Sequence, residues 1–332
     1  QMAEAFFRRR TEQGNYTMPN AKYRNFLPQL NKKVMLTDGG LETFLVFELE
    51  IDLPCFAAIY LMCRPDGETI LRNYYKPYID LARSSNRGLI LATPTWRASA
   101  DWEAGIGLTH DEMMDAHRRA AALMATIRDE HETPESPFVI SADLGPRGDG
   151  YVPSLVMTAA EAEAYHRPQI AVLAETETDM ITALTLNYAE EAIGIVRAAK
   201  AVNMPAAISF TVETDGRLPT GQSLAEAIAQ VDAETGNAPA YYMINCAHPT
   251  HFADALASGA AWTRRIQGIR ANASCLSHAE LDGCTELDTG NPVELGAQYR
   301  QLQNRLPALN VFGGCCGTDH RHIAEIARQI AA

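Results

Sequence analysis

The sequence predicts an α/β protein, a single (β/α)₈ TIM barrel, from three observations. Short apolar or β-branched runs alternate with longer amphipathic stretches, the cycle can be counted eight times, and no glycine-rich linker divides it. The chain has 332 residues, which a rule of roughly 150 residues per domain would divide in two, but one barrel often holds about 250 residues or more. Its 47% hydrophobic content can fill a large core. An open doubly wound sheet is the alternative.

Each expected strand is short and mostly apolar, as a parallel strand covered on both faces should be. The strands are expected at 33–37, 88–93, 138–142, 179–184, 206–210, 241–245, 266–270 and 310–314. A helix is expected after each, at 67–87, 110–131, 159–175, 189–202, 223–234, 249–258, 292–305 and 318–331. Several of these helices begin at residues that cap helices well, among them Thr158, Ser223 and Asp319.

The remaining length falls in an irregular N-terminal extension and in three long βα connections. We expect the extension at residues 1–30 and the barrel at 31–332. The long connections are 42–66, 145–157 and 272–291. Such connections gather at the C-terminal face of a barrel, where active sites form.

Charge and hydropathy exclude two classes of partner. Lys and Arg total 28 and Asp and Glu 41, so the formal net charge is −13, which repels a nucleic-acid backbone. The most apolar stretch, 44–63, is interrupted by Glu48, Glu50, Asp52 and Pro54, short of the roughly 20 apolar residues that a membrane helix needs. No apolar run follows the arginines at 8–10, so cytoplasm is the expected location. We expect small-molecule partners, and a homo-oligomer stays an open expectation.

The cysteines carry the strongest functional signal. Seven is an odd number and two are adjacent, which favours a reducing compartment with metal or thiol chemistry over a disulfide framework. Asn245-Cys246-Ala247-His248 stands at the end of the sixth expected strand and Gly313-Gly314-Cys315-Cys316-Gly317 at the end of the eighth. Three thiols then meet at one barrel mouth, which suits zinc with a fourth position open for substrate. The alternative is that these are small buried core residues.

With these motifs the chain resembles the zinc-dependent homocysteine S-methyltransferases, which include betaine- and S-methylmethionine-dependent enzymes, over nearly its whole length. Further matches are Asp38-Gly39-Gly40-Leu41-Glu42-Thr43, Asp52-Leu53-Pro54, Leu91-Ala92-Thr93 with Trp96, Gly145-Pro146-Arg147-Gly148 and Ile208-Ser209-Phe210-Thr211. The resemblance implies a barrel that binds zinc through Cys246, Cys315 and Cys316, takes the thiolate of homocysteine as fourth ligand, and methylates it to methionine.

Zinc chemistry agrees with that implication. A free thiol has a pKa near 8.5, whereas coordination to zinc removes its proton. Three cysteinates, a substrate thiolate and Zn²⁺ sum to −2, which keeps the substrate sulfur electron-rich toward a cationic methyl donor. No general base is required of the protein.

The expected donor is a free small sulfonium or quaternary ammonium compound, because 332 residues leave no room for folate or cobalamin modules. Such cations bind to aromatic faces. Trp96 is the first candidate for this contact, and the alternative is that it packs in the core or rim. Behind it come Trp102, Phe44, Tyr151 and Phe210.

On the acceptor side, Asp38 is expected to receive the amino group of an amino-acid substrate, with the amides of Gly39 and Gly40 close by, although Asp-Gly-Gly is also an ordinary turn. Thr93 and Asn245 resemble family positions that contact the acceptor or orient the metal site. Asn272 falls where the family often has an asparagine.

One position departs from the family pattern. Where members usually read Glu-Thr at the end of the fourth strand, this chain reads Ala183-Leu184-Thr185. If that glutamate normally holds the acceptor's ammonium, Leu184 removes it. The acceptor is then a different thiol, served by a methyltransferase or demethylase, or another acid substitutes: Glu213, Asp143 or Asp149.

Two other readings use the same residues. Zinc that activates water would give a hydrolase or lyase, but three thiolates disfavour it. A non-catalytic redox or metal-sensing protein would cycle Cys315 and Cys316 between thiol and disulfide. We expect His248, His320 and His322 on helices leading away from the site, and Cys55, Cys63, Cys275 and Cys284 to be structural or incidental.

Overall fold

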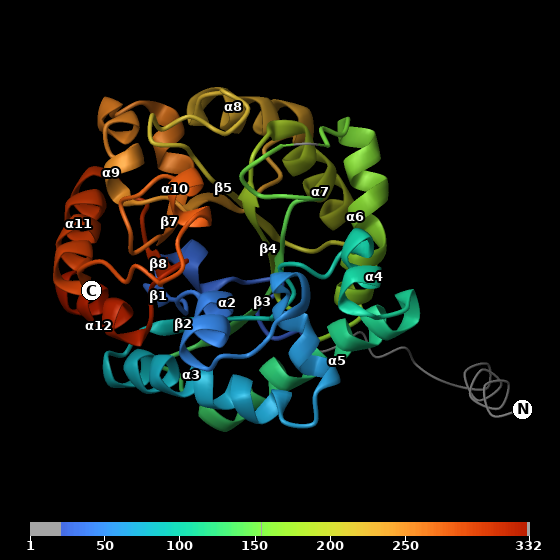
Figure 1. Ribbon diagram of the computed structural model, residues 1–332. Helices are drawn as coiled ribbons and strands as arrows, with labels where there is room; N and C mark the ends of the chain where they lie inside the picture. The colour runs from blue at the N-terminus through green and yellow to red at the C-terminus, as the bar shows by residue number, and fades with distance from the viewer. Residues whose placement is uncertain (1–20, 154, 331–332) are drawn as a thin grey trace, which may run out of the picture.

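The computed structural model describes residues 21–153 and 155–330, and in them the eight expected strands close into a parallel barrel (Figure 1). Each strand pairs with the next, and the eighth returns to the first, Met35 opposite Val311. This closure excludes the open doubly wound sheet. The strands are β1 (Met35–Leu36), β2 (Gly88–Ala92), β3 (Phe138–Leu144), β4 (Met180–Leu186), β5 (Ala206–Phe210), β6 (Tyr241–Asn245), β7 (Ile266–Ala271) and β8 (Val311–Gly314).

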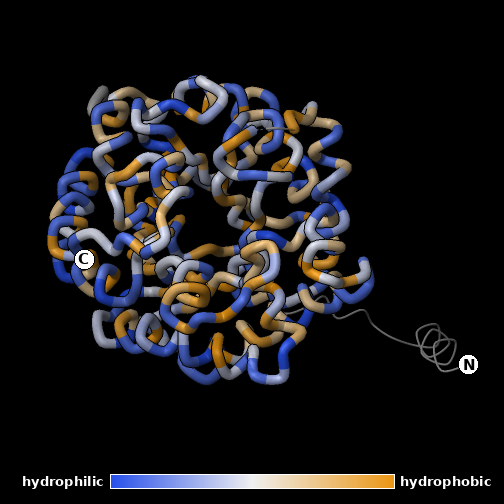
Figure 2. The backbone as a smooth tube through the Cα atoms, viewed as in Figure 1, coloured by the Kyte–Doolittle hydropathy of each residue, from blue (hydrophilic) through white to orange (hydrophobic). Residues whose placement is uncertain are grey.

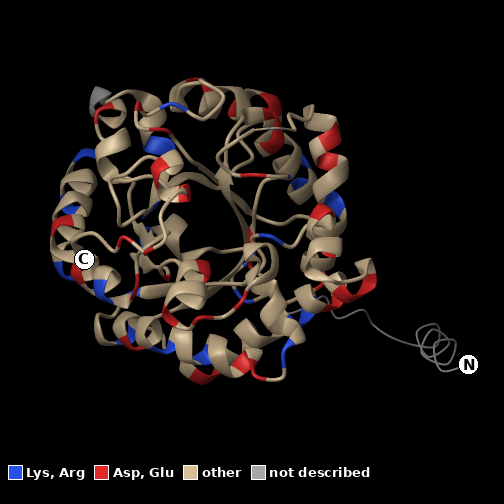
Figure 3. Cartoon of the chain, in the orientation of Figure 1, with Lys and Arg blue, Asp and Glu red and all other residues tan. Residues whose placement is uncertain are grey.

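Helices form the outer layer that covers the barrel (Figure 1). Hydrophobic residues run through the inner part of the molecule, and charged residues gather on the outer helices (Figures 2 and 3). The larger helices are α3 (Gly67–Ser84), α5 (His110–His131), α6 (Ala159–Ala174), α7 (Ala189–Ala201), α8 (Leu224–Thr235), α11 (Pro292–Arg305) and α12 (His320–Gln329). Short helices lie in the connections, among them α2 (Leu41–Thr43), η2 (Phe44–Glu48), α4 (Glu103–Ile106), α9 (Pro249–Phe252), η6 (Ala255–Ser258) and α10 (His278–Asp282).

The strands read as continuous apolar runs because both of their faces are covered. Every residue of β2 to β6 is buried. Inward side chains fill the barrel and outward ones pack on helices, so no face is left for polar residues. A charged or hydroxyl residue inside such a strand therefore marks a special role.

The expected helix starts are confirmed. The side chains of Thr158, Ser223 and Asp319 cap α6, α8 and α12, each accepting a hydrogen bond from a backbone amide of the first turn. The helix expected at 249–258 is instead split into α9 and η6, and Gly259, in the left-handed region at φ 62°, closes the second piece.

The described part of the N-terminal extension closes the N-terminal end of the barrel. Leu27 packs with residues at the starts of the strands, including Met35, Met180 and Tyr241. Arg24 donates hydrogen bonds to the carbonyls of Ala174, Thr176 and Thr178. The first twenty residues of the predicted extension lie outside the described residues.

Within the described ranges, no helix combines the length and the apolar character needed to cross a bilayer.

Candidate metal centre and substrate pocket

A cavity of about 460 Å³ opens at the C-terminal end of the barrel. Its walls come from the strand ends and from all three long connections. The predicted metal ligands and the first candidates for substrate binding all line it: Asp38, Gly39, Gly40, Thr93, Trp96, Asn245, Cys246, Cys315 and Cys316.

Three cysteine sulfurs meet at one point of the cavity wall. The Sγ atoms of Cys246, which follows β6, and of Cys315 and Cys316, which follow β8, all lie within 4.8 Å of one another. Cys246 and Cys315 are joined as a disulfide, and Cys316 is free. Reduction of that bond frees three thiols in the arrangement that a tetrahedral metal site requires.

The disulfide between Cys246 and Cys315 differs from the one expected in the redox hypothesis, which paired Cys315 with Cys316. Adjacent Cα atoms are about 3.8 Å apart, shorter than the roughly 4.4–6.8 Å that disulfides usually span. The Cα atoms of Cys246 and Cys315 are 5.4 Å apart. The barrel therefore brings together two cysteines 69 residues apart in sequence in preference to neighbours.

Tight backbone packing holds the cysteine segments in place. Cys246 has a left-handed φ of 52°, and its carbonyl accepts a hydrogen bond from His278 Nε2 at 2.5 Å. A Cβ added to Gly313 would lie 1.8 Å from Thr37 Oγ1, and one added to Gly314 would lie 2.0 Å from Thr318 Oγ1. Only glycine fits at these two positions, so they let the strand end pass close to its neighbours.

Gly39 and Gly40 bring the first connection against the cysteine turn. A Cβ on Gly39 would lie 2.5 Å from the carbonyl oxygen of Thr318, and one on Gly40 would lie 2.6 Å from that of Cys315. The Gly40 amide donates to the Thr318 carbonyl at 3.0 Å. Besides lining the cavity, the two glycines thus support the backbone that carries Cys315.

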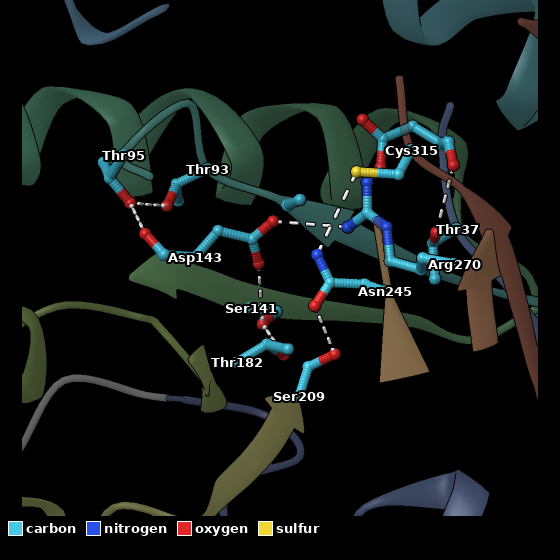
Figure 4. Close-up of polar contacts among 12 residues, drawn as sticks. Thr37, Thr93, Thr95, Ser141, Asp143, Thr182, Ser209, Asn245, Arg270 and Cys315 are labelled. Carbon is cyan, nitrogen blue, oxygen red and sulfur yellow. Dashed lines mark hydrogen bonds and ion pairs between the residues drawn. The ribbon is translucent and has the colours of Figure 1, made fainter. Parts of the chain in front are cut away.

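Asn245 braces three strand ends beneath the sulfur cluster (Figure 4). Its Oδ1 accepts from Ser209 Oγ at 2.6 Å and from the Thr185 amide at 2.8 Å, and its Nδ2 donates to Thr185 Oγ1 at 2.9 Å. The same Nδ2 points toward Cys315 Sγ at 4.0 Å. These bonds explain why Thr185 holds a left-handed φ of 61° where β4 and β5 shift register.

Arg270, at the end of β7, is the centre of a buried ion-pair network (Figure 4). Its guanidinium reaches Asp38 Oδ1 at 2.8 Å and Asp143 Oδ2 at 3.3 Å, and its Nε donates to the Gly314 carbonyl at 3.0 Å. Tyr74 donates to the other oxygen of Asp38 at 3.1 Å. Both oxygens of Asp38 thus have protein partners before any substrate arrives.

Burial and ion pairing have opposite effects on the pKa values of the charged groups in this network. Burial disfavours the charge of Arg270, but Asp38 and Asp143 outweigh it and raise the pKa of the guanidinium. Burial raises the pKa of Asp143 to about 8 despite the attraction of Arg270. Burial raises the pKa of Asp38 as well, and Arg270 and the Tyr74 hydroxyl oppose that rise.

Of the aromatic candidates for donor binding, Trp96 and Tyr151 line the cavity, whereas Trp102, Phe44 and Phe210 are not among its lining residues. The Arg97 guanidinium lies 4.9 Å from the centre of the Trp96 ring and 4.6 Å from that of Trp102. One cation of the protein itself therefore already contacts Trp96.

The free thiol of Cys316 is partly buried and has a hydrogen bond to the Tyr151 hydroxyl. Burial raises the pKa of Cys316 to about 11, the charge of Glu42 adds to the rise, and the Tyr151 hydroxyl opposes it. Without a cation at the sulfur cluster this thiol stays protonated at neutral pH. Burial likewise raises the pKa of the Glu42 carboxyl to about 7, with Asp38 adding to the effect.

Leu184 forms a buried, apolar part of the cavity wall at the end of β4. Of the three acids proposed to replace a glutamate there, Asp143 and Asp149 line the cavity, and Glu213 is outside its lining. Asn272 lines the cavity as well.

Within the described residues, the sulfur cluster does not include a histidine. His248 instead caps α9, and His322 Nε2 lies 2.7 Å from the Thr289 carbonyl oxygen.

Sequence reasoning missed the roles of Arg270, Glu42 and His278. Arg270 had a signal, since it is a charged residue inside a run that otherwise reads as a buried strand. Glu42 stood inside the Asp-Gly-Gly motif without a role of its own. His278 lies in a long connection, whose course the sequence did not predict.

Comparisons with known proteins agree with this geometry. A family model described as homocysteine S-methyltransferase matches residues 35–330. Methionine synthases of Mycobacterium leprae and Mycobacterium tuberculosis are each 25% identical over 92% of the chain, but the chain spans only about a quarter of their length, 25% in each case.

The solved structures that resemble the chain share its fold. The homocysteine methyltransferase MmuM from Escherichia coli, in its metallated form, aligns with a TM-score of 0.72 at 19% identity over 91% of this chain and 98% of that one. Its oxidised form aligns with a TM-score of 0.71 at 20% identity over 90% of this chain and 97% of that one.

Proposed function

The chain belongs to the homocysteine S-methyltransferase family, and on that premise we propose that it transfers a methyl group from a small cationic donor to the sulfur of homocysteine, giving methionine. The observation that carries the proposal is the convergence of three cysteine sulfurs in the wall of the one cavity that contains all the predicted substrate residues. This arrangement is suited to chemistry on a sulfur atom of a substrate bound in the cavity.

The residues fit a zinc ion. Three cysteine sulfurs are the soft donor set that zinc prefers, and three protein ligands leave a fourth position for substrate. We assign Cys246, Cys315 and Cys316 as these ligands in the reduced protein. A zinc ion bound there would supply one thing to the reaction, namely a lowered pKa for the acceptor thiol.

The surrounding residues hold and shield this centre. The Asn245 amide and the His278 ring fix the segment that carries Cys246, and Gly39 and Gly40 fix the turn that carries Cys315. We propose Asp38, Gly39, Gly40, Thr93 and Asn245 as the acceptor side of the pocket and Trp96 as the donor side. Leu184, Phe47 and Phe56 add apolar side chains to the cavity wall.

The experiment begins with metal content and methyl transfer by protein reduced with a phosphine. We expect one zinc per chain, and formation of methionine from homocysteine with S-methylmethionine or betaine, detected by mass spectrometry. Cys315→Ala should weaken zinc binding by more than about 100-fold, because loss of a direct ligand exceeds the 10–100-fold cost of losing a residue that only orients one. Methionine formation should fall with it.

Cys63→Ala is the matched control, because Cys63 is exposed and outside the cavity lining. It should keep both zinc and activity. Full zinc retention by Cys315→Ala, or equal methyl transfer by metal-free protein, would overturn the assignment.

A further inference from the structure

Among the described residues, Glu42 places in the cavity a partly buried carboxylate that no other side chain pairs with. We propose that Glu42 receives the ammonium group of the amino-acid acceptor, an inference that rests on the function proposed above and names the residue that recognises the substrate.

The other acids deep in the cavity are already engaged. Asp38 and Asp143 share Arg270. Asp149 Oδ1 accepts from the amides of Tyr151 and Val152, at 2.7 and 2.9 Å, and its other oxygen lies 3.8 Å from Arg97. Three more acids that line the cavity are exposed residues of the 272–291 connection: Asp282, Glu286 and Asp288.

Glu42 differs from all of them. It is partly buried on α2 and lines the cavity, and within the described part of the chain its carboxylate accepts a hydrogen bond from its own backbone amide but pairs with no side chain. A carboxylate withdrawn from water is costly unless it is paired, and the nearby Asp38 is a like charge. A cationic group of a ligand is therefore the partner that this carboxylate lacks.

The position of Glu42 suits an acceptor bound through sulfur. The residues that flank it contact the cysteine turn: a Cβ added to Gly40 would lie 2.6 Å from the Cys315 carbonyl oxygen, and Thr43 Oγ1 accepts a hydrogen bond from the Gly317 amide at 3.3 Å. Helix α2 therefore lies against the turn that carries Cys315 and Cys316. In homocysteine only three carbon atoms separate the sulfur from the ammonium nitrogen, so both ends can be held in this corner. The part of the wall that β4 supplies consists of Leu184 and Thr185, neither of which carries a charge that could hold the ammonium.

The chemistry of the carboxylate favours the acceptor over the methyl donor. An ammonium has N–H groups that make charge-assisted hydrogen bonds to carboxylate oxygens. A sulfonium or quaternary ammonium centre has no such hydrogens and is bound better by aromatic faces, which Trp96 and Tyr151 supply.

The test measures thiol binding to reduced, Co²⁺-substituted protein, through the absorbance of the new cobalt–thiolate bond. L-homocysteine is compared with 4-mercaptobutanoate, which lacks only the amino group. The wild type should bind homocysteine at least about tenfold more tightly, as expected for one charge-assisted hydrogen bond. Glu42→Gln should abolish that preference and leave the affinity for 4-mercaptobutanoate within about twofold.

Two further variants separate recognition from folding. Glu48→Gln alters an exposed acid of the adjacent η2 and should keep the preference. Glu42→Asp keeps the charge on a shorter side chain and should retain part of the preference for homocysteine. Because the Glu42 carboxylate has no ion pair to lose within the described chain and the glutamine oxygen can still accept from the same backbone amide, Glu42→Gln should melt at or above the wild-type temperature and bind cobalt as well.

The outcomes distinguish this inference from the proposed function. The role of Glu42 would be overturned if Glu42→Gln bound and methylated homocysteine with the wild-type preference over 4-mercaptobutanoate. It would also be overturned if Glu42→Gln raised the KM for the methyl donor alone, or if the wild type preferred 4-mercaptobutanoate. A wild type that binds neither thiol and methylates neither would overturn the proposed function and this inference with it.

Discussion

Arg270 shows how one side chain can organise a whole site. Its guanidinium joins the end of β7 to Asp38 after β1, to Asp143 on β3 and to the Gly314 carbonyl of β8. The backbone carbonyl of the same residue accepts the Cys246 amide at 3.1 Å. Arg270 therefore helps to position the backbone that carries Cys246 through this hydrogen bond.

Replacing Arg270 by methionine should be strongly destabilising. The change leaves Asp38 and Asp143 buried without a cation, and breaking a buried ion pair in this way costs about 3–5 kcal/mol of unfolding free energy. Urea denaturation of the wild type and Arg270→Met measures the difference. Arg270→Met in an Asp38→Asn, Asp143→Asn background should cost clearly less, and an equal cost there would show that the charges are not the cause.

At the scale of the element, α5 is anchored at two points in its first half. A capping box at Thr109 satisfies the first amides of the helix. About two turns later, His117 is fully buried, with Nε2 3.0 Å from the Ala98 carbonyl oxygen in the connection after β2. The helix thus holds the loop that carries Trp96 and Arg97.

His117 should make the stability of the fold depend on pH. Burial lowers the pKa of His117 from 6.5 to about 4, against the hydrogen bond to Ala98, which opposes the shift. The unfolded chain then takes up a proton first on acidification, so this stability is complete above pH 6.5 and is lost as the pH falls toward 4. From the size of the shift, the loss is roughly 3 kcal/mol at most.

The measurement is urea denaturation at several pH values between 4 and 7. His117→Gln keeps a hydrogen-bond donor without the titration and should show a flatter profile. His110→Gln, at the exposed start of the same helix, should follow the wild type. Identical slopes for wild type and His117→Gln would contradict the assignment.

Across the whole molecule, the two ends of the barrel have different tasks. The N-terminal end is closed by Leu27 and the apolar residues at the strand starts. The C-terminal end carries the cavity, the sulfur cluster and the Arg270 network. This division is general for the fold, in which the top face bears function and the bottom face stability.

Leu27→Ala should separate the two tasks. Leu27 is 2% exposed, and removing such a core side chain costs about 2–5 kcal/mol of unfolding free energy. Zinc content and methyl transfer by the folded protein should stay at the wild-type level. Leu30, in the 3₁₀ helix η1 (Pro28–Asn31) that directly follows Leu27, is 46% exposed, and Leu30→Ala should change stability by less than about 0.5 kcal/mol. A loss of zinc in Leu27→Ala would show that the two ends are coupled.

Much of the architecture could be predicted because it depends on local patterns. The strands at Ala206–Phe210 and Tyr241–Asn245 and the helix at His110–His131 lie where periodicity and caps place them. The edges of other strands could not be predicted, because pairing decides them: β1 is confined to Met35–Leu36, and β4 runs on to Leu186 through the kink that Asn245 holds at Thr185.

The sequence by itself determined the barrel and the three sulfur ligand candidates, since a repeated βα pattern brings all strand ends to one face and the cysteines stand at two of those ends. Only the tertiary structure decided the partners of the charged groups. Asp38 and Asp143 pair with Arg270 across 232 and 127 residues of chain, whereas Glu42 pairs with no side chain among the residues that the structure describes. Charge pairing depends on distances of a few ångströms between segments remote in sequence, which no local pattern records.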